Sequence, residues 1–419
     1  MREDFYWLTD NSRLFLSRGY LGEGQTAENR LREIAERAEG ILGIEGFANK
    51  FYDYLGKGYY SLSTPVWTNF GNQRGLPISC FGSNIPDDMG GILYAASEVG
   101  MMSKYGGGTS GYFGKLRERG AAIANNGQSS GAVHFMKLFE QMTDTVSQGS
   151  ARRGRFAAYL SIDHPDIEEF LEIGVEGNDI QGLNHGVTVT DEWLLEMVGG
   201  DKNKRATWAK LLQRRVEMGY PYIFFTDTVN NNKPEWYKDM PITHSNLCAE
   251  IALPNNEEWS FVCNLSSMNA LHFDEWKDTD AVETMIYFLD AVMTEFIEKL
   301  ENLRDSDGRD DQDAFHFMRK AYQFAVDNRA LGLGVLGWHS LLQSRLLPFA
   351  STEASLLNEK LFKTIRERAD QATKELAELY GEPKVMRGTG KRNATLMAIA
   401  PTTSSAFILG QASQSIEPL

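Results

Sequence analysis

Cysteine is scarce in this chain, with three residues in 419, at positions 80, 248 and 263. An odd number argues against a framework of structural disulfides. The sequence has no Cys-x-x-Cys pair, which excludes zinc ribbons and thioredoxin-like redox motifs. Such scarce cysteines are either small buried apolar residues or reactive thiols, and for any single cysteine the buried alternative is the commoner one.

Metal-binding spacings and membrane-spanning runs are also missing. The seven histidines are scattered, without a His-x-x-x-His or Glu-x-x-His spacing, so we expect no metal site in this chain. The first ten residues contain no apolar signal core, and no apolar run is long enough to span a bilayer. We therefore predict a cytoplasmic protein, in the host cytoplasm if a phage encodes it, without a membrane partner.

An excess of positive charge is missing as well, because 42 Lys and Arg face 57 Asp and Glu, for a formal net charge of −15. Binding to duplex DNA depends on cations that neutralise phosphates, so DNA is not an expected partner. Small phosphate groups remain suitable ligands, held by backbone amides and a few arginines. Without a linker or a shift in composition, one extended domain is favoured over two.

Helical and strand patterns alternate along the chain. Apolar residues recur at helical spacing near 31–38, where Gly40 is expected to end the helix, and again at 135–142, 281–303 and 354–380. Short β-type runs lie between these helices, at 157–162, 186–189, 222–225, 249–253 and 395–400. The alternation predicts an α/β architecture with a largely parallel sheet.

The segment 244–251 carries the strongest chemical pattern. Asn246, Cys248 and Glu250 alternate with apolar residues, so an extended backbone would place all three on one face. A thiol flanked by an amide and a carboxylate is a competent reactive cluster. The alternative is a half-buried strand with a polar outer side, and the spacing alone does not separate the two.

The other two cysteines form a second candidate. Cys80 and Cys263 could cycle between dithiol and disulfide as a redox pair. They could equally be two unrelated core residues, because the sequence does not show that they meet.

Three stretches, two of which contain glycine, invite a phosphate or nucleotide interpretation. Residues 332–337 match Gly-x-Gly-x-x-Gly, but a helical run precedes them and Leu357 stands where an acidic residue is needed, so we predict a tight turn or strand. Residues 148–154 and 401–405 offer arginines, hydroxyls and backbone amides that suit phosphate. Each could also be an ordinary surface turn.

Taken in order, these segments resemble the large, catalytic subunit of class I ribonucleotide reductase in its phage or bacterial form. The most specific part is Asn-Leu-Cys-x-Glu-Ile at 246–251, with one cysteine on each side. The remaining segments of the resemblance are 63–65, 78–80, 106–110, 147–154, 163–166, 263–265, 332–334, 392–396, 401–405 and 415–418.

The resemblance implies an α/β fold, a ten-stranded α/β barrel of the ribonucleotide reductase and glycyl radical enzyme type. Residues 1–60 would form an N-terminal helical segment packed on the barrel, and 61–419 would form the catalytic barrel. Cys248 would lie on a loop threaded into the barrel centre.

The resemblance also implies a ribonucleoside-diphosphate reductase that works by radical chemistry. Cys248 would become a thiyl radical that abstracts the 3′-hydrogen of the ribose, Glu250 would be the general base on the 3′-hydroxyl, and Asn246 would hold that hydroxyl. Cys80 and Cys263 would supply two electrons and finish as a disulfide. A thiyl radical requires an enclosed site from which water is excluded.

Two nucleotide sites follow from the same resemblance. The substrate phosphates would contact Thr64, Ser79, Thr402, Thr403, Ser404 and Ser405. A deoxynucleotide or ATP effector would bind at the interface of a homodimer. Its site would include Asp87, Arg117 and the loop 120–128, and the loop with Arg152 would relay its effect to the substrate. The sequence departs from the family at Ala124, where a second effector-side arginine is expected.

Three further departures shape the expected partners. The N-terminal ATP-cone is absent, the chain stops where the family continues into more barrel and a redox-active tail, and the chain has no radical-generating metal. We therefore expect no cofactor bound by this chain, a radical from a metal-containing small subunit, and thioredoxin or glutaredoxin as reductant. We also expect a separate C-terminal fragment or remainder of the large subunit, without which the chain would be inactive.

Three alternatives remain. A class II reductase would take its radical from adenosylcobalamin, and activity with that cofactor alone would identify it. A nucleotide-binding regulatory module would bind effector without turnover. An unrelated α/β protein with three core cysteines would bind no nucleotide.

Overall fold

The computed structural model describes residues 5–73, 75–78, 80–124, 127–148, 153–410 and 412–418. The chain forms two compact units that are interleaved in sequence. The first unit comprises Met1–Ser79, Cys263–Asn302 and Ala325–Leu419, and the second comprises Cys80–Val262 and Leu303–Phe324. The predicted boundary at residue 60 falls inside the first unit. Because each unit is assembled from separated stretches, no change in composition marks the boundary between them.

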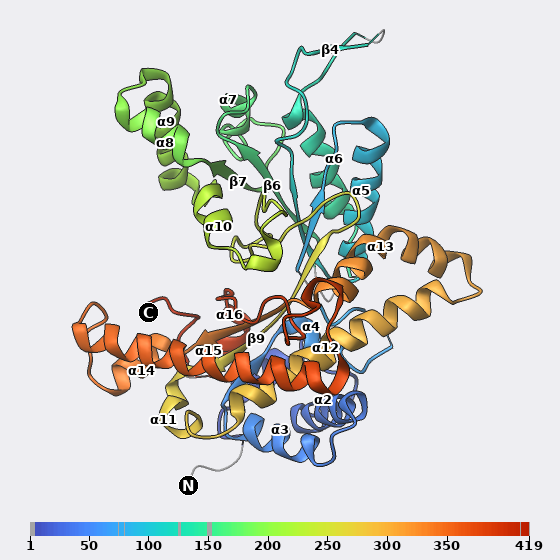
Figure 1. The fold of residues 1–419 in the computed structure, drawn as a ribbon, viewed down its shortest axis with the longest axis vertical. Helices are drawn as coiled ribbons and strands as arrows, with labels where there is room; N and C mark the ends of the chain where they lie inside the picture. The colour runs from blue at the N-terminus through green and yellow to red at the C-terminus, as the bar shows by residue number, and fades with distance from the viewer. Residues whose placement is uncertain are drawn as a thin grey trace. The chain divides into compact units, whose positions relative to one another are not determined.

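The second unit is built on a parallel sheet with the strand order β2-β3-β6-β7-β8. Strands β6 and β7 of this sheet are labelled in Figure 1. These strands are β2 (Cys80–Asn84), β3 (Gly108–Tyr112), β6 (Arg155–Ser161), β7 (Asn184–Val189) and β8 (Tyr222–Phe225). Parallel neighbours require crossover connections, which the helices between successive strands provide. The predicted parallel α/β arrangement is confirmed here.

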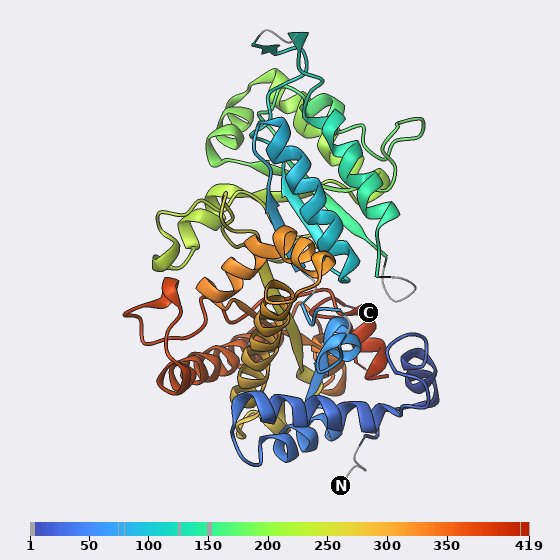
Figure 2. The same ribbon diagram turned by 90° about the vertical axis from the view of Figure 1, so that its right-hand side faces the viewer.

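The remaining elements of this unit connect or cover the sheet. They are α5 (Met89–Lys104), β4 (Ala122–Ile123), β5 (Gly127–Gln128), α6 (Ala132–Thr145), α7 (Ile167–Phe170), α8 (Asp191–Gly199), α9 (Lys202–Met218), α10 (Thr226–Asn232) and η1 (Glu235–Tyr237). Helices α5 and α6 run side by side next to the strands (Figures 1 and 2). Strands β4 and β5 form a separate two-stranded hairpin.

The two faces of β6 are buried in different environments. Phe156, Ala158 and Leu160 belong to a large apolar cluster that includes residues of α5 and α6. Ala157 and Tyr159 belong to a smaller cluster on the opposite face. The alternation follows from the period of two along a strand, and it places the Tyr159 side chain on the face opposite α5 and α6.

The first unit carries the other strands and most of the long helices. They are α1 (Asp10–Leu16), α2 (Ala27–Leu42), α3 (Phe47–Gly56), β1 (Tyr60–Leu62), α4 (Thr64–Asn69), β9 (Phe261–Asn269), η2 (Ala270–His272), α11 (Phe273–Trp276), α12 (Ala281–Arg304), β10 (Leu331–Leu336), α14 (Trp338–Ser344), α15 (Thr352–Tyr380), η3 (Lys384–Met386) and α16 (Thr403–Ile408). Strand β9 pairs antiparallel with β1 and parallel with β10. Helix α13 (Arg309–Asn328) contributes residues to both units, and the first two residues of β9 and the last two of α12 belong to the second unit.

The Gly-x-Gly-x-x-Gly stretch is strand β10, as the prediction of a tight turn or strand required. A Cβ on Gly332 would lie 2.4 Å from Leu265 Cδ2, and a Cβ on Gly334 would lie 2.7 Å from the Ala398 carbonyl oxygen. The glycines are therefore needed because neighbouring chain segments approach the strand closely.

Three of the predicted helices are confirmed as α6, α12 and α15. The end predicted at Gly40 is wrong, because α2 continues to Leu42 and is capped by Gly43, whose φ is +64°. The predicted strand at 395–400 is reduced to a single bridge between Leu333 and Met397. The strand at 249–253 is replaced by a turn and irregular backbone.

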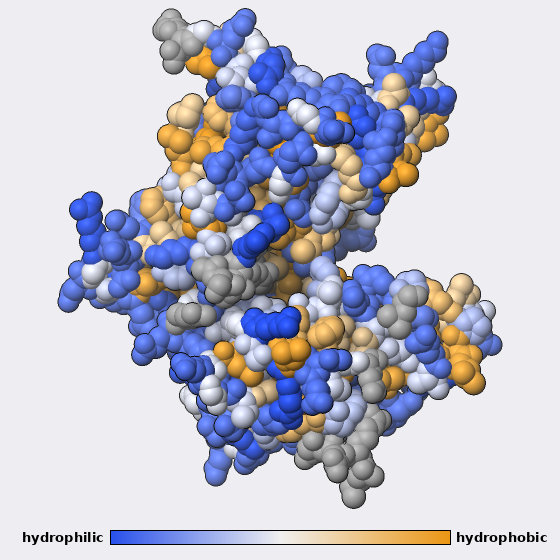
Figure 3. Space-filling view, turned by 180° about the vertical axis from the view of Figure 1, so that it is seen from behind, coloured by the Kyte–Doolittle hydropathy of each residue, from blue (hydrophilic) through white to orange (hydrophobic). Residues whose placement is uncertain are grey.

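The surface seen in Figure 3 is largely hydrophilic, with apolar side chains gathered in separate areas. Among the described residues, no helix combines the length and the apolar character that a membrane crossing needs.

Candidate active site

The segment 244–251 is a turn and not an extended strand. Ala249 has a φ of +67°, in the left-handed region that residues with a Cβ rarely adopt. Its N–H group donates to the Asn246 carbonyl at 3.3 Å. The extended backbone that would have placed Asn246, Cys248 and Glu250 on one face is therefore not formed, and the chain turns between Asn246 and Glu250.

The Asn246 side chain organises this turn. Its Oδ1 accepts the backbone N–H groups of Glu250 at 3.1 Å and of Ile251 at 3.2 Å. These are donors that a strand would have used in a ladder, which explains the absence of a strand here. The Ser245 hydroxyl donates to the Ile251 carbonyl at 2.6 Å. The Asn246 Nδ2 donates to the Cys80 Sγ at 3.6 Å, so one amide joins the turn to a thiol distant in sequence.

Glu250 is largely removed from water. Desolvation raises the pKa of its carboxyl group, and the hydrogen bond with Asn246 opposes this effect only in part. Its Oε2 is buried and has no hydrogen-bond partner among the described residues. A carboxyl group with a raised pKa and an unused oxygen is suited to exchange a proton with a bound ligand.

The three cysteines differ in exposure. Cys248 is exposed at the tip of the turn, and Cys80 is partly buried at the first residue of β2. Cys263 is buried on β9 in the first unit, where a Cβ on Gly332 would lie 2.8 Å from its Sγ. Cys80 therefore lies with the turn, while the pairing of Cys80 with Cys263 stays a prediction.

The predicted phosphate residues of the first unit lie at the start of two short helices. Thr402 is the residue just before α16, and its Oγ1 accepts the Ser415 N–H at 2.7 Å. Ser405 Oγ donates to the Leu62 carbonyl at 3.3 Å, which joins α16 to the strand just before Thr64. Thr403 Oγ1 donates to Gln414 at 2.9 Å, and Ser404 is partly buried on α16. Thr64 Oγ1 lies 3.0 Å from Tyr20 Oη. Ser79 lies outside the described residues.

Two predicted effector residues meet at the surface of the second unit. Arg117 Nε donates to Asp87 Oδ2 at 2.8 Å, and its backbone N–H donates to Oδ1 at 3.1 Å. Ala124 follows β4 and is exposed. Arg152 lies outside the described residues. Of the predicted effector residues, Asp87 and Arg117 are therefore in contact with each other.

Tyr159 is a residue of this site that the sequence patterns did not indicate. Its side chain is fully buried, and its hydroxyl donates to the Asn246 carbonyl at 2.8 Å. Its position in the run 157–162 predicts which face of a strand it occupies. Local sequence does not show which loop covers that face, because Tyr159 and Asn246 are 87 positions apart.

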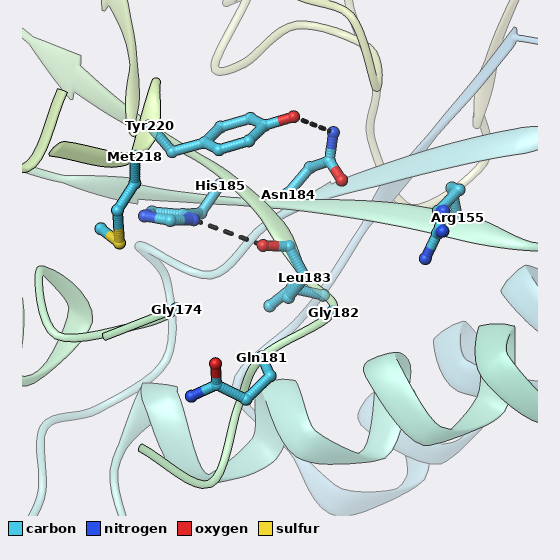
Figure 4. A pocket seen from close by; sticks show the side chains of 9 residues that line it. All are labelled: Arg155, Gly174, Gln181, Gly182, Leu183, Asn184, His185, Met218 and Tyr220. Carbon is cyan, nitrogen blue, oxygen red and sulfur yellow. Dashed lines mark hydrogen bonds between the residues drawn. The ribbon is translucent and has the colours of Figure 1, made fainter. Parts of the chain in front are cut away.

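A cavity of about 580 Å³ lies elsewhere in the second unit, at the first residues of β6 and β7 (Figure 4). Its lining includes His185 and Tyr220, whose rings stack at 5.5 Å, and Asn184, which donates to the Tyr220 hydroxyl at 2.8 Å. Burial lowers the pKa of His185 to about 4, so its ring is neutral at pH 7. The predicted site residues do not line this cavity. Within the described ranges, no group of three or more His, Cys, Asp or Glu side chains is placed to hold a metal ion.

Comparison with known families gives a match over most of the chain. The family model described as "Ribonucleotide reductase, barrel domain" matches residues 78–203 and 201–389. A frog virus 3 (isolate Goorha) protein named as a ribonucleoside-diphosphate reductase large subunit is 34% identical over 406 residues, covering 92% of this chain and 68% of the viral protein. The ribonucleoside-diphosphate reductase large subunit of invertebrate iridescent virus 3 is 29% identical, covering 89% of this chain and 68% of that subunit.

A solved structure agrees with these matches. The alpha subunit of the Actinobacillus ureae class Id ribonucleotide reductase superimposes with a TM-score of 0.93 at 54% sequence identity. The superposition covers 100% of this chain and 77% of that subunit. The predicted fold class, an α/β barrel of this type with N-terminal helices, is confirmed.

Proposed function

Because this chain belongs to the ribonucleotide reductase family as a catalytic large subunit, we propose that the turn 244–251 performs its chemistry. Cys248 is the residue that carries the thiyl radical, and the substrates are ribonucleoside diphosphates, the class named for the viral relatives. The radical comes from a separate small subunit. The turn presents the Cys248 thiol on its exposed side, where a substrate can reach it.

The reaction assigns each group of the turn one task. The Cys248 thiyl radical takes the 3′-hydrogen of the ribose, and the Glu250 carboxylate takes the proton of the 3′-hydroxyl. Loss of the protonated 2′-hydroxyl releases water. Cys80 and Cys263 give two electrons and two protons, one proton to the leaving 2′-hydroxyl and one to the 2′ carbon, and form a disulfide. Glu250 returns its proton to the 3′-oxygen, and the 3′-hydrogen returns from the Cys248 thiol, which regenerates the radical. In sum, one ribonucleotide and two thiols give one deoxyribonucleotide, one disulfide and one water.

The observation that carries this proposal is the double role of Asn246. Its Oδ1 closes the turn that bears Cys248 and Glu250, while its Nδ2 donates to the Cys80 thiol. Radical carrier, base and one reducing thiol are thereby gathered around one amide group. The raised pKa of Glu250 supports its role as the base, since a base works best when its pKa is near the operating pH.

The remaining assignments extend this proposal beyond the turn. The substrate phosphates contact Thr64, Ser79, Thr402, Thr403, Ser404 and Ser405. A deoxynucleotide or ATP effector binds near Asp87, Arg117 and Arg152 in a homodimer. Thioredoxin or glutaredoxin returns the disulfide to two thiols. The ion pair between Asp87 and Arg117, and the bond from Ser405 to the strand before Thr64, support these groupings.

The test separates the radical carrier from the reducing thiols. Cys248→Ser, Cys80→Ser and Cys263→Ser are each assayed in the assembled reductase, with the small subunit and a dithiol reductant. We expect all three to lose deoxynucleotide formation. Only Cys248→Ser should also lose cleavage of the 3′ C–H bond, followed as release of tritium from 3′-labelled substrate. Tritium release that survives Cys248→Ser would disprove the assignment of Cys248.

A further inference from the structure

Tyr159 is the only described side chain whose hydroxyl holds the backbone carbonyl of Asn246. The tyrosine lies in β6, in the middle of the parallel sheet, and its side chain is fully buried. The bond of 2.8 Å ends two residues before Cys248. A rigid strand is thereby joined directly to the turn that presents the reactive thiol.

The tyrosine ring is also enclosed by its neighbours. It packs against the His244 ring at 5.5 Å, and His244 is the first residue of the turn segment. On the neighbouring strand, Gly186 is paired with Tyr159, and a Cβ on Gly186 would lie 2.4 Å from Tyr159 Cε1. The ring therefore occupies the space that any other residue at 186 would fill.

The hydroxyl has no other evident purpose in its surroundings. The cluster around the ring contains Ala157, Phe224 and Ile242, against which a phenylalanine would pack equally well. A buried tyrosine needs a partner for its O–H group, and here the partners are the Asn246 carbonyl and the Ser245 side chain. Both belong to the turn. Burial also raises the pKa of Tyr159 well above its ordinary value, so the hydroxyl stays protonated and remains a donor.

The turn itself needs external support. Ala249 is in the left-handed region without being glycine, a conformation that persists only where the surroundings enforce it. Asn246 Oδ1 bonds within the turn, and Asn246 Nδ2 reaches the sheet only at the first residue of β2, through the bond of 3.6 Å to Cys80 Sγ. The bond of 2.8 Å from Tyr159 is shorter and ties the turn to β6, in the middle of the sheet.

We propose that Tyr159 is a positioning residue for the radical-carrying turn, whose hydroxyl sets the distance between the Cys248 sulfur and the substrate 3′-hydrogen, and that Gly186 is required to seat its ring. The inference rests on the proposed role of Cys248. Hydrogen abstraction is steep in distance, and a displacement of about 1 Å in a reacting group lowers rates by about 100-fold.

The experiment compares Tyr159 with Tyr60, a second tyrosine whose hydroxyl binds a backbone carbonyl outside the turn 244–251. Tyr60 is also fully buried, and its hydroxyl donates to a backbone carbonyl, that of Ala281, at 2.5 Å. Tyr159→Phe and Tyr60→Phe therefore remove the same atom and the same kind of bond. Both are assayed in the assembled reductase for kcat, KM and the kinetic isotope effect with substrate deuterated at the 3′ carbon.

We expect Tyr159→Phe to lower kcat by about 10- to 100-fold with little change in KM, and to raise the isotope effect, because hydrogen abstraction becomes slower. Tyr60→Phe should lower the unfolding midpoint by a similar amount and leave kcat and the isotope effect unchanged. Equal kcat values and isotope effects in the two variants, with matched loss of stability, would show that Tyr159 is merely structural and overturn the proposal.

Two more variants keep the outcomes separable. Gly186→Ala, which displaces the ring, should reproduce the kinetic pattern of Tyr159→Phe, and a normal kcat in it would contradict the role of the ring. Cys248→Ser tests the underlying assignment. If Cys248→Ser retains activity, the proposed function fails. If it is inactive while Tyr159→Phe behaves like Tyr60→Phe, only the positioning role fails.

Discussion

Removal of the Asp290 carboxylate is expected to destabilise the first unit strongly. Asp290 lies on α12 and is 1% exposed. Its Oδ1 accepts from Arg329 Nε and from Asn393 Nδ2, and its Oδ2 accepts from Arg392 Nε, each at 2.9 Å. Arg329 lies just before β10, and Arg392 lies just before the segment that pairs with β10 through the bridge between Leu333 and Met397. The Asp290 carboxylate therefore joins α12 to β10 and to that segment.

The magnitude follows from the charges that remain. Burial alone would raise the pKa of Asp290, but the guanidinium groups of Arg329 and Arg392 outweigh it and lower the pKa to about 2. Against about 3.9 in an unfolded chain, this difference corresponds to about 2–3 kcal/mol of stability at pH 7. Asp290→Ala also leaves Arg329 and Arg392, whose side chains are 8% and 12% exposed, without their carboxylate, so we expect the free energy of unfolding to fall by about 3–5 kcal/mol.

Urea unfolding at pH 7, followed by tryptophan fluorescence, measures this loss. Asp305→Ala is the matched control, because Asp305 also pairs with an arginine, Arg304, but its side chain is 65% exposed. The control should leave the unfolding midpoint unchanged, since exposed ion pairs contribute little. The stabilisation from Asp290 is complete above pH 4 and should disappear as the pH falls towards 2, because the folded state binds the proton less tightly. Equal midpoints for the two variants would refute the reasoning.

Two further predictions concern the site itself. The raised pKa of Glu250 should place the acidic limb of the kcat–pH profile at a higher pH than an ordinary glutamate would, because the base must lose its proton before it can act. Glu250→Gln should remove that limb and lower kcat by about 100- to 10,000-fold. An unchanged limb in this variant would exclude Glu250 as the base. Gly332→Ala should destabilise the protein by about 1–3 kcal/mol, because its Cβ would lie 2.8 Å from Cys263 Sγ. Gly199→Ala is the control, since no atom lies within 4 Å of the new Cβ, and it should leave the stability unchanged. Thermal unfolding of both variants measures the difference.

The sequence by itself determined the family and the class of fold. The order of the three cysteines, with Asn246 and Glu250 around the central one, carries the family resemblance that the comparisons confirm. The helices α12 and α15 were also predictable, because a long helix repeats its apolar residues locally. Local periodicity was misleading at 249–253, where the Asn246 side chain takes the N–H groups that a strand would have used.

Only the tertiary structure decided how the site is held. The contact of Asn246 with Cys80 joins residues 166 positions apart, and the bond from Tyr159 to Asn246 spans 87 positions. The network at Asp290 likewise gathers arginines 39 and 102 positions away. Such contacts depend on how strands are ordered and how chain segments return to them. A sequence pattern that repeats every two or four residues predicts which face of a strand or helix a side chain occupies. It does not predict which other chain segment packs against that face.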